Sequence, residues 1–265
     1  MSFLLNLSSS ERKVFKQHFL SSVHSEIRFN PIETNIILDN KDRLDSEFKK
    51  LGFAESKKIM QGNFQLEADL ENAQAPKLSQ ESEALGLVFN SQSPLRELKI
   101  EKDKIVYSDF SYASFEEYQS DFRSFFDVTC ELLSINDVLI NKVGLRKVNS
   151  VAIQPFLSFD NLNIFNPALF STARSGLLKI DKFRINEETI LLEESNDKLF
   201  ILRTKLAKKG EDSAEASMDA DFVKLGSDMS VDDSFNDILP SLNQCHYDLF
   251  MWSVTDEMRN LMESK

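Results

Sequence analysis

Arg146 and Asn149 carry side chains that together suit the binding of an anion or of a partner's backbone. They lie close together in one predicted strand, beside Gly144, where the lack of a side chain lets another backbone approach. An arginine fork and an amide so placed can clasp a carboxylate, a phosphate or a peptide backbone. The alternative, which we favour, is an internal salt bridge from Arg146 to a helix carboxylate such as Glu116 or Asp121.

His246 is the third candidate side chain. It stands one turn from Leu242 and Leu249, on the apolar stripe of a predicted C-terminal helix. A hydrogen-bonded histidine at the edge of the core is commoner there than a general base. As a base it would need a nucleophile or an oriented water, which a sequence cannot supply. We therefore interpret His246 as structural and leave ligand or partner binding open.

Glu97 and Lys99 are the best lead for catalysis. Their two-residue spacing on a short predicted strand puts a carboxylate and an amine on one face, as a metal-dependent nuclease needs. The same pattern is typical of the solvated face of a half-buried strand, and we favour that interpretation. Asp219 and Asp221 also share a face and could hold a cation, but they border a predicted acidic loop and solvation explains them as well.

The spacing of the other chemistry-bearing residues excludes several enzyme classes. The seven glycines are far apart, so no glycine-rich loop is present to cradle a nucleotide phosphate. His18, His24 and His246 are the only imidazoles, and no zinc-protease or hydrolase motif includes them. We therefore predict a protein without cofactor or metal and, since no catalytic motif is present, a non-enzymatic one.

Composition limits the partners. Forty-three acidic against 31 basic residues give a net charge of −12, which repels phosphate backbones and argues against nucleic-acid binding. The same acidity suits a basic protein partner, although it is also an ordinary means of staying soluble. The 22 phenylalanines, against four tyrosines and one tryptophan, favour aromatic core packing over base stacking.

We expect a soluble, cytoplasmic protein with no membrane segment. No stretch approaches the roughly 18 consecutive apolar residues of a spanning helix, and the first residues lack the basic and apolar regions of an export signal. Cys130 and Cys245 form no CxxC pair, so we expect two small buried thiols rather than a zinc or disulfide-exchange site.

The apolar pattern indicates strands followed by long helices. Alternation predicts strands, and spacing by three and four predicts helices at 34–51, from Phe115 onward, and from about Pro240 to Met262. Ser114 and Glu117 form a capping box at the start of the second helix. The residues 71–83 and 208–220 are predicted loops. Predicted strands are 23–29, 59–66, 85–89, 95–100, 105–110, 138–153, 177–185, 189–192, 199–206 and 221–225.

Both halves place several antiparallel strands before one long amphipathic helix, which must bury its stripe on the concave face of its own sheet. We predict an α+β fold in which duplicated antiparallel sheet units each pack on one such helix. The halves would be residues 1–155 and 156–265, as two domains or one continuous domain.

Four stretches carry a resemblance to a sporadically distributed, uncharacterised prokaryotic family of about this length. They are FLSSVHSEIRF at 19–29, YASFEEY at 112–118, VGLRKVN at 143–149, and His246 and Phe250 followed by VTDEMR at 254–259. The chain departs from the family pattern at Phe115, where tryptophan is usual, and at Lys147, where an aromatic residue is frequent. The resemblance implies an α+β fold and a bacterial origin in a defence or conflict system, and carries over no activity.

Three functions from different classes follow. The first, which we prefer, is a non-enzymatic interaction subunit or regulator, in a bacterial antiviral defence-type system, with a protein partner. The second is a small-ligand or nucleotide sensor whose sheet grips a pocket against the long phenylalanine-rich helix, with Arg146 and Asn149 as polar anchors. The third is a metal-dependent nuclease around Glu97 and Lys99.

Overall fold

The computed structural model describes residues 5–13, 15, 18–67, 77–135, 138–194 and 197–263, and for 63–67 and 77–81 it describes the backbone alone. The strands are β1 (Leu20–Phe29), β2 (Lys57–Glu67), β3 (Lys77–Gln92), β4 (Leu95–Glu101), β5 (Lys104–Asp109), β6 (Ile140–Ile153), β7 (Ile185–Glu194), β8 (Lys198–Lys208) and β9 (Ala214–Met229). The helices are α1 (Thr34–Asp39), α2 (Lys41–Lys50), α3 (Phe115–Leu132), the 3₁₀-helix η1 (Phe159–Leu162), α4 (Ser171–Arg174), α5 (Val231–Asp233), the π-helical turn η2 (Ser234–Ile238), α6 (Leu239–Ser253) and α7 (Asp256–Glu263).

The strands form one open, antiparallel sheet in the order β2-β3-β4-β5-β1-β6-β9-β8-β7. The predicted α+β class is confirmed, and the strands of both halves belong to this single sheet. β6 of the first half pairs with β9 of the second, with Leu145 opposite Phe222 and Arg146 opposite Asp221. The division at residue 155 stays a prediction.

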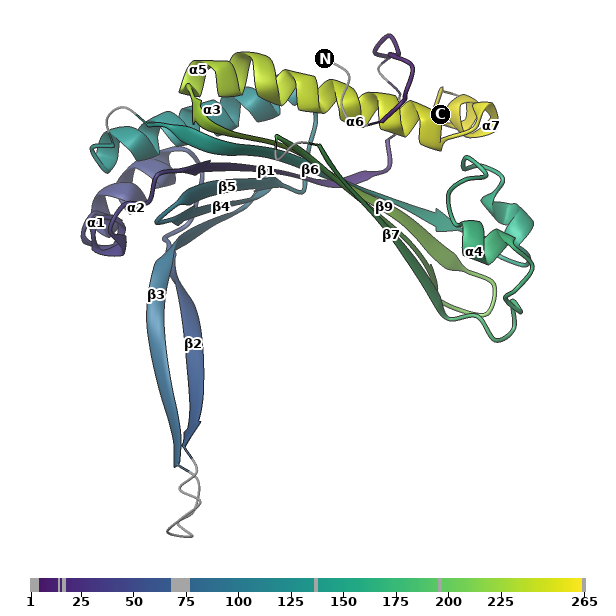
Figure 1. The fold of residues 1–265 in the computed structure, drawn as a ribbon, viewed down its shortest axis with the longest axis horizontal. Coiled ribbons are helices and arrows are strands. Elements are labelled where there is room, and N and C mark those ends of the chain that lie inside the picture. Colours follow the sequence, from purple (N-terminus) through teal and green to yellow (C-terminus); the bar gives the residue numbers. More distant parts are fainter. Residues whose placement is uncertain are drawn as a thin grey trace.

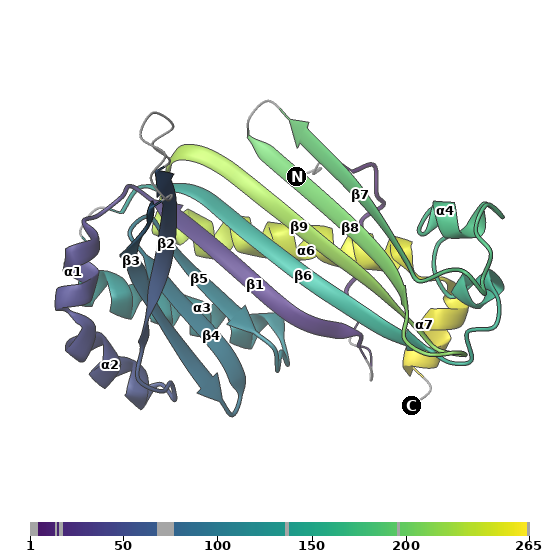
Figure 2. The same cartoon turned by 90° about the horizontal axis from the view of Figure 1, so that it is seen from below.

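The long helices cover one face of the sheet. The sheet arches, and α3 and α6 lie along its convex side (Figure 1). Seen from below, the strands lie in front of both helices, so the concave face has no helix across its centre (Figure 2). The expectation that the helices would occupy the concave face is wrong. The twist of the strands curves the sheet away from the helices at both ends, toward the uncovered side.

α3 holds the centre of the core, as its pattern predicts. Phe115, Tyr118, Phe122 and Phe125 are buried on the helix side of the sheet. The helix begins where the Ser114 hydroxyl accepts a hydrogen bond from the Glu117 backbone N–H at 3.1 Å, which satisfies one of the free N–H groups of the first turn. The cap and the apolar stripe therefore fix where the helix starts and which face it buries.

The predicted C-terminal helix is two helices. α6 ends at Ser253, and Val254 is extended, with φ −110° and ψ 143°. The segment before α4 causes the break, because the Thr255 N–H donates to the Ile164 carbonyl at 3.0 Å and Asn166 N–H donates to the Ser253 carbonyl at 2.8 Å. The predicted helix at 34–51 is likewise divided, into α1 and α2, at Asn40.

Three other local predictions are wrong in part. No strand forms at 177–184, where the chain makes turns before β7 begins at Ile185. Most of the predicted loop 208–220 is strand β9, which begins at Ala214. Of the predicted loop 71–83, residues 77–83 belong to β3, and 71–76 lie outside the described residues.

Within the described ranges, no helix has the length and apolar character needed to cross a membrane.

Candidate functional site

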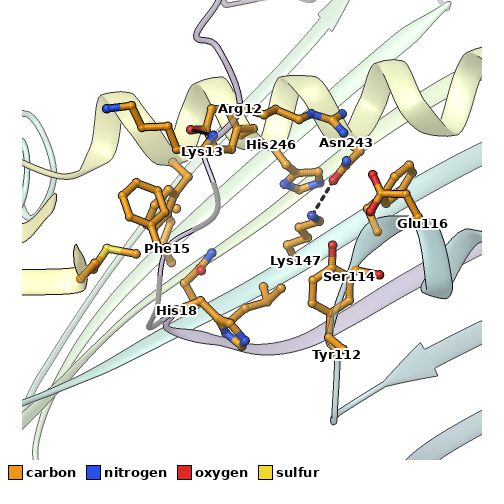
Figure 3. Close-up of a pocket in the computed structure, with 18 residues that line it drawn as sticks. Arg12, Lys13, Phe15, His18, Tyr112, Ser114, Glu116, Lys147, Asn243 and His246 are labelled. Carbon is orange, nitrogen blue, oxygen red and sulfur yellow. Dashed lines mark hydrogen bonds between the residues drawn. The ribbon is translucent and has the colours of Figure 1, made fainter. Parts of the chain in front are cut away.

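A pocket of about 310 Å³ opens between the sheet and the helices. Its floor is β6 and β9, and its sides are the start of α3, the middle of α6 and the segment that leads into β1 (Figure 3). The volume lies in the range of small-molecule sites, about 300–1,000 Å³. The lining residues are Arg12, Lys13, Phe15, His18, Leu20, Tyr112, Ala113, Ser114, Phe115, Glu116, Lys147, Asn149, Met218, Asn243, His246, Tyr247, Phe250 and Met262.

The N-terminal segment is held against α6 by polar contacts. The Ser10 N–H donates to Asp248 Oδ1 at 2.8 Å, and the Lys13 N–H donates to the Tyr247 hydroxyl at 2.7 Å. Arg12 Nε donates to Gln244 Oε1 at 2.9 Å. These bonds place the side chains of Arg12 and Lys13 at the pocket's outer wall.

Lys147 is the cation on the pocket floor. Its Nζ donates to Asn243 Oδ1 at 2.6 Å and lies 5.2 Å from the centroid of the Tyr112 ring and 5.9 Å from that of Phe115 (Figure 3). It makes no salt bridge with any described residue. By contrast, Lys142 on the same strand pairs with Glu26 at 2.8 Å. Lys147 is therefore a sheltered charge stabilised by an amide oxygen and two aromatic faces.

The surroundings of Lys147 weaken its hold on a proton. Burial, together with the nearby positive charge of Arg12, lowers the pKa of Lys147 from 10.5 to about 7. The negative charge of Glu116 opposes this shift. The amine is thus poised to gain its charge when an anion enters the pocket.

His246 stands beside Lys147, one turn along α6 from Asn243. Its Nε2 donates to the Leu145 carbonyl at 2.7 Å, and its ring meets Phe222 edge to face at 4.7 Å. Since a carbonyl only accepts, Nε2 carries the proton and Nδ1 is the ring's acceptor. Burial and the charge of Lys147 lower the pKa of His246 to about 3. The imidazole is therefore neutral at ordinary pH and fixes α6 to β6.

Arg146 and Asn149 do not act together, because they lie on opposite faces of β6. Asn149 lines the pocket with Lys147. Arg146 lies on the uncovered face, where its Nε and one terminal nitrogen donate to the two carboxylate oxygens of Asp219, each at 2.7 Å. Its partner is a residue of the neighbouring strand rather than the helix carboxylates Glu116 or Asp121 considered above.

The uncovered face carries ion pairs between and along strands. Glu97 and Lys99 pair with each other at 2.8 Å. Asp219 also lies 3.6 Å from Arg203, and burial raises the pKa of Asp221. In the part of the chain that the structure describes, no group of three or more histidine, cysteine, aspartate or glutamate side chains could hold a metal ion. The pairing satisfies these charges locally.

Lys147 is a pocket residue that no sequence motif marks as a candidate for binding. Val143, Leu145 and Val151, which alternate with polar residues, indicate the buried face of the strand, and Lys147 shares their parity. A lysine at a position that faces the core is unusual in a strand, and this signal in the sequence could have identified Lys147. Asn149 has the same parity, which also separates it from Arg146.

No model of a protein family matches the chain, and no curated protein matches it. Among solved structures, the comparison returns the di-domain ARO/CYC StfQ from the steffimycin biosynthetic pathway. The two sequences are 6% identical, the match covers 92% of this chain and 98% of that one, and the TM-score is 0.19. A TM-score this low establishes no shared fold. The resemblance to a prokaryotic family stays a prediction.

Proposed function

We propose that this protein binds a small molecule in the pocket between β6, β9, α3 and α6. The observation that carries the proposal is the combination, in one cavity of about 310 Å³, of a largely apolar lining and a sheltered lysine that has no carboxylate partner among the described residues. Ligand sites in proteins are concave, mostly apolar and furnished with a few polar groups. This is the sensor hypothesis with different anchors: Lys147 and Asn149 in place of Arg146 and Asn149.

Filling the pocket tests the proposal. Asn149→Trp adds an indole to the pocket, whereas Val148→Trp adds the same group on the other face of the same strand. Native mass spectrometry and thermal shift across a panel of metabolites should show a retained or stabilising molecule for the natural protein and for Val148→Trp, and none for Asn149→Trp. Equal binding by both variants would place the ligand elsewhere.

The strand order also supports the predicted duplication, which we retain as a proposal. Outward from the β1–β6 pair, one side of the sheet has β5, β4, β3 and β2, and the other has β9, β8 and β7, so that the first side has one strand more. In the chain, a long helix follows each of these sets of strands: α3 follows β5, and α6 follows β9. Such a repeat would place the pocket between its two units, because α3 and α6 both line it. A cytoplasmic location and a role in a defence-type system stay predictions.

A second function, protein binding, is favoured by β7. This strand ends the sheet, and it exposes Ile185, Ile190 and Leu191 by 55%, 50% and 61%. An exposed apolar edge is a template for adding a strand from another chain. β7 carries four glutamates and no basic residue, so pairing with a second copy would set glutamates against glutamates. The occupant that fits is an extended basic segment of a partner protein.

Leu191→Lys tests this second proposal, because it removes an apolar contact and adds a repelling charge for a basic partner. Met60→Lys, on the strand at the other end of the sheet and 53% exposed, is the matched control. Affinity purification should return a stoichiometric partner that Leu191→Lys loses and Met60→Lys keeps. A partner retained by both variants, or crosslinked away from β7, would refute it.

A further inference from the structure

The pocket concentrates positive charge in an acidic protein. Arg12, Lys13 and Lys147 line it, and Glu116 is the one carboxylate among the lining residues that the structure describes. The whole chain has the opposite balance, with a net charge of −12. Because the pocket is locally positive while the whole chain is negative, an anion is attracted to the pocket more than to the rest of the surface.

We infer that the pocket binds a small organic acid, an apolar body with one anionic group, and that Lys147 is the residue that binds the anionic group. The inference rests on the proposed function and names its ligand class.

Among the described residues, Lys147 lacks the counter-ion that several other lysines of the sheet have. Lys99, Lys142 and Lys224 each form a salt bridge with a described carboxylate. Lys147 has the neutral amide of Asn243 as its polar partner. A sheltered cation without a counter-ion costs free energy, because its charge is removed from water and not compensated. An anionic ligand would supply the missing counter-ion. Asn243 takes one of the ammonium group's three donors, and Lys147 donates to no other described residue, which leaves two donors for that ligand.

The aromatic rings of the pocket argue against a cationic ligand. The Tyr112 ring lies under Lys147 Nζ at 5.2 Å, and the Phe115 ring has Arg12 and Lys147 each at 5.9 Å. These two rings, which could attract a quaternary ammonium group, are therefore engaged by the protein's own cations. Arg12 and Lys147 would also repel a cationic ligand.

The rest of the lining suits an apolar body of modest size. Its apolar side chains come from the N-terminal segment, from β1, from β9 and from the helices α6 and α7. The rings of Phe15 and Phe250 meet edge to face, with 6.1 Å between their centroids. These side chains are Phe15, Leu20, Met218, Phe250 and Met262. They lie around the cavity that Lys147 enters from its floor, so one molecule can contact both.

A matched pair of dyes tests the inference. 1-Anilinonaphthalene-8-sulfonate carries an anionic group on an apolar body, and N-phenyl-1-naphthylamine has the same rings without it. Fluorescence titration of the natural protein should give about tenfold to hundredfold tighter binding of the sulfonate, the range for a charge-assisted hydrogen bond. Equal binding would overturn the inference and leave the proposed function standing, whereas binding of neither dye would count against the proposed function itself.

The variant Lys147→Met tests whether Lys147 is the residue that causes the preference for the sulfonate dye. We expect this variant to bind the neutral dye as before and to lose the preference for the sulfonate. Lys99→Met, on the uncovered face, should keep it. A preference that survives in Lys147→Met would refute the role of Lys147. Circular dichroism and neutral-dye binding show whether the variant is folded, and the dye comparison in the natural protein decides the ligand class without it.

Discussion

The ligand-free protein should become more stable relative to Lys147→Met as the pH rises. The pKa of Lys147 is about 7 in the folded protein against 10.5 for a free lysine side chain. Between these values the unfolded chain binds more protons at this residue than the folded protein does. Stability therefore rises with pH across this window, and a methionine at this position cannot contribute to that rise.

The expected change is large enough to measure. Each unit of pKa shift corresponds to about 1.4 kcal/mol. From about pH 7.5 to about pH 9.5, inside the window, a full shift would contribute up to about 3 kcal/mol. Because part of Lys147 is open to the pocket, solvent reduces this, and we expect about 2 kcal/mol. For a chain of this size the difference in Tm would change by roughly 4–8 °C.

Urea denaturation of both proteins, followed by circular dichroism at three pH values, measures this difference. Raised pKa values, such as that of Cys130 at about 12, contribute equally to both proteins and cancel. Lys99→Met controls for the loss of one lysine from the sheet. The difference in free energy of unfolding between this variant and the natural protein should change by less than about 1 kcal/mol over the same pH range. Parallel stability curves for the natural protein and Lys147→Met would refute the description of Lys147 as a sheltered amine with a lowered pKa.

Three further outcomes are expected. Acid should destabilise the protein progressively as the pH falls from 6.5, because the lowered pKa values of His246, about 3, and His24, about 4, make the unfolded chain bind more protons; a stability maximum near pH 4 would contradict this. Ser114→Ala should cost about 1 kcal/mol in urea denaturation, since it removes the cap of α3, and an unchanged midpoint would show the cap to be unimportant. Cys130 and Cys245 should react with iodoacetamide far more slowly in the folded protein than in urea, because burial raises their pKa values to about 12 and 11; equal rates would contradict that burial.

Elements with a strong local pattern were predictable. The phenylalanine stripe and serine cap of α3, and the alternation in β1, each depend on residues within one element. β9 was partly missed for a reason that its packing explains. Its buried positions Ala214, Ala216 and Ala220 are small, so that the alternation with Glu215 and Asp219 resembles the composition of a loop. The alternation was present but without the large side chains that usually reveal it.

Features set by distant parts of the chain were not predictable. α6 ends because the segment at 164–166 bonds to Ser253 and Thr255, and no glycine or proline marks the place. Arg146 meets Asp219 only through the register of β6 with β9. The pocket likewise needs the N-terminal segment to lie on α6. Parity along β6 was the one local clue, and it separates Lys147 and Asn149 from Arg146.

A crystal structure of the protein with 1-anilinonaphthalene-8-sulfonate would test the central claim most directly. We predict the dye in the pocket, with a sulfonate oxygen about 2.7–3.2 Å from Lys147 Nζ and the rings against Phe15 and Phe250. A dye bound on the uncovered face of the sheet, or in the pocket with its sulfonate turned away from Lys147, would contradict the account.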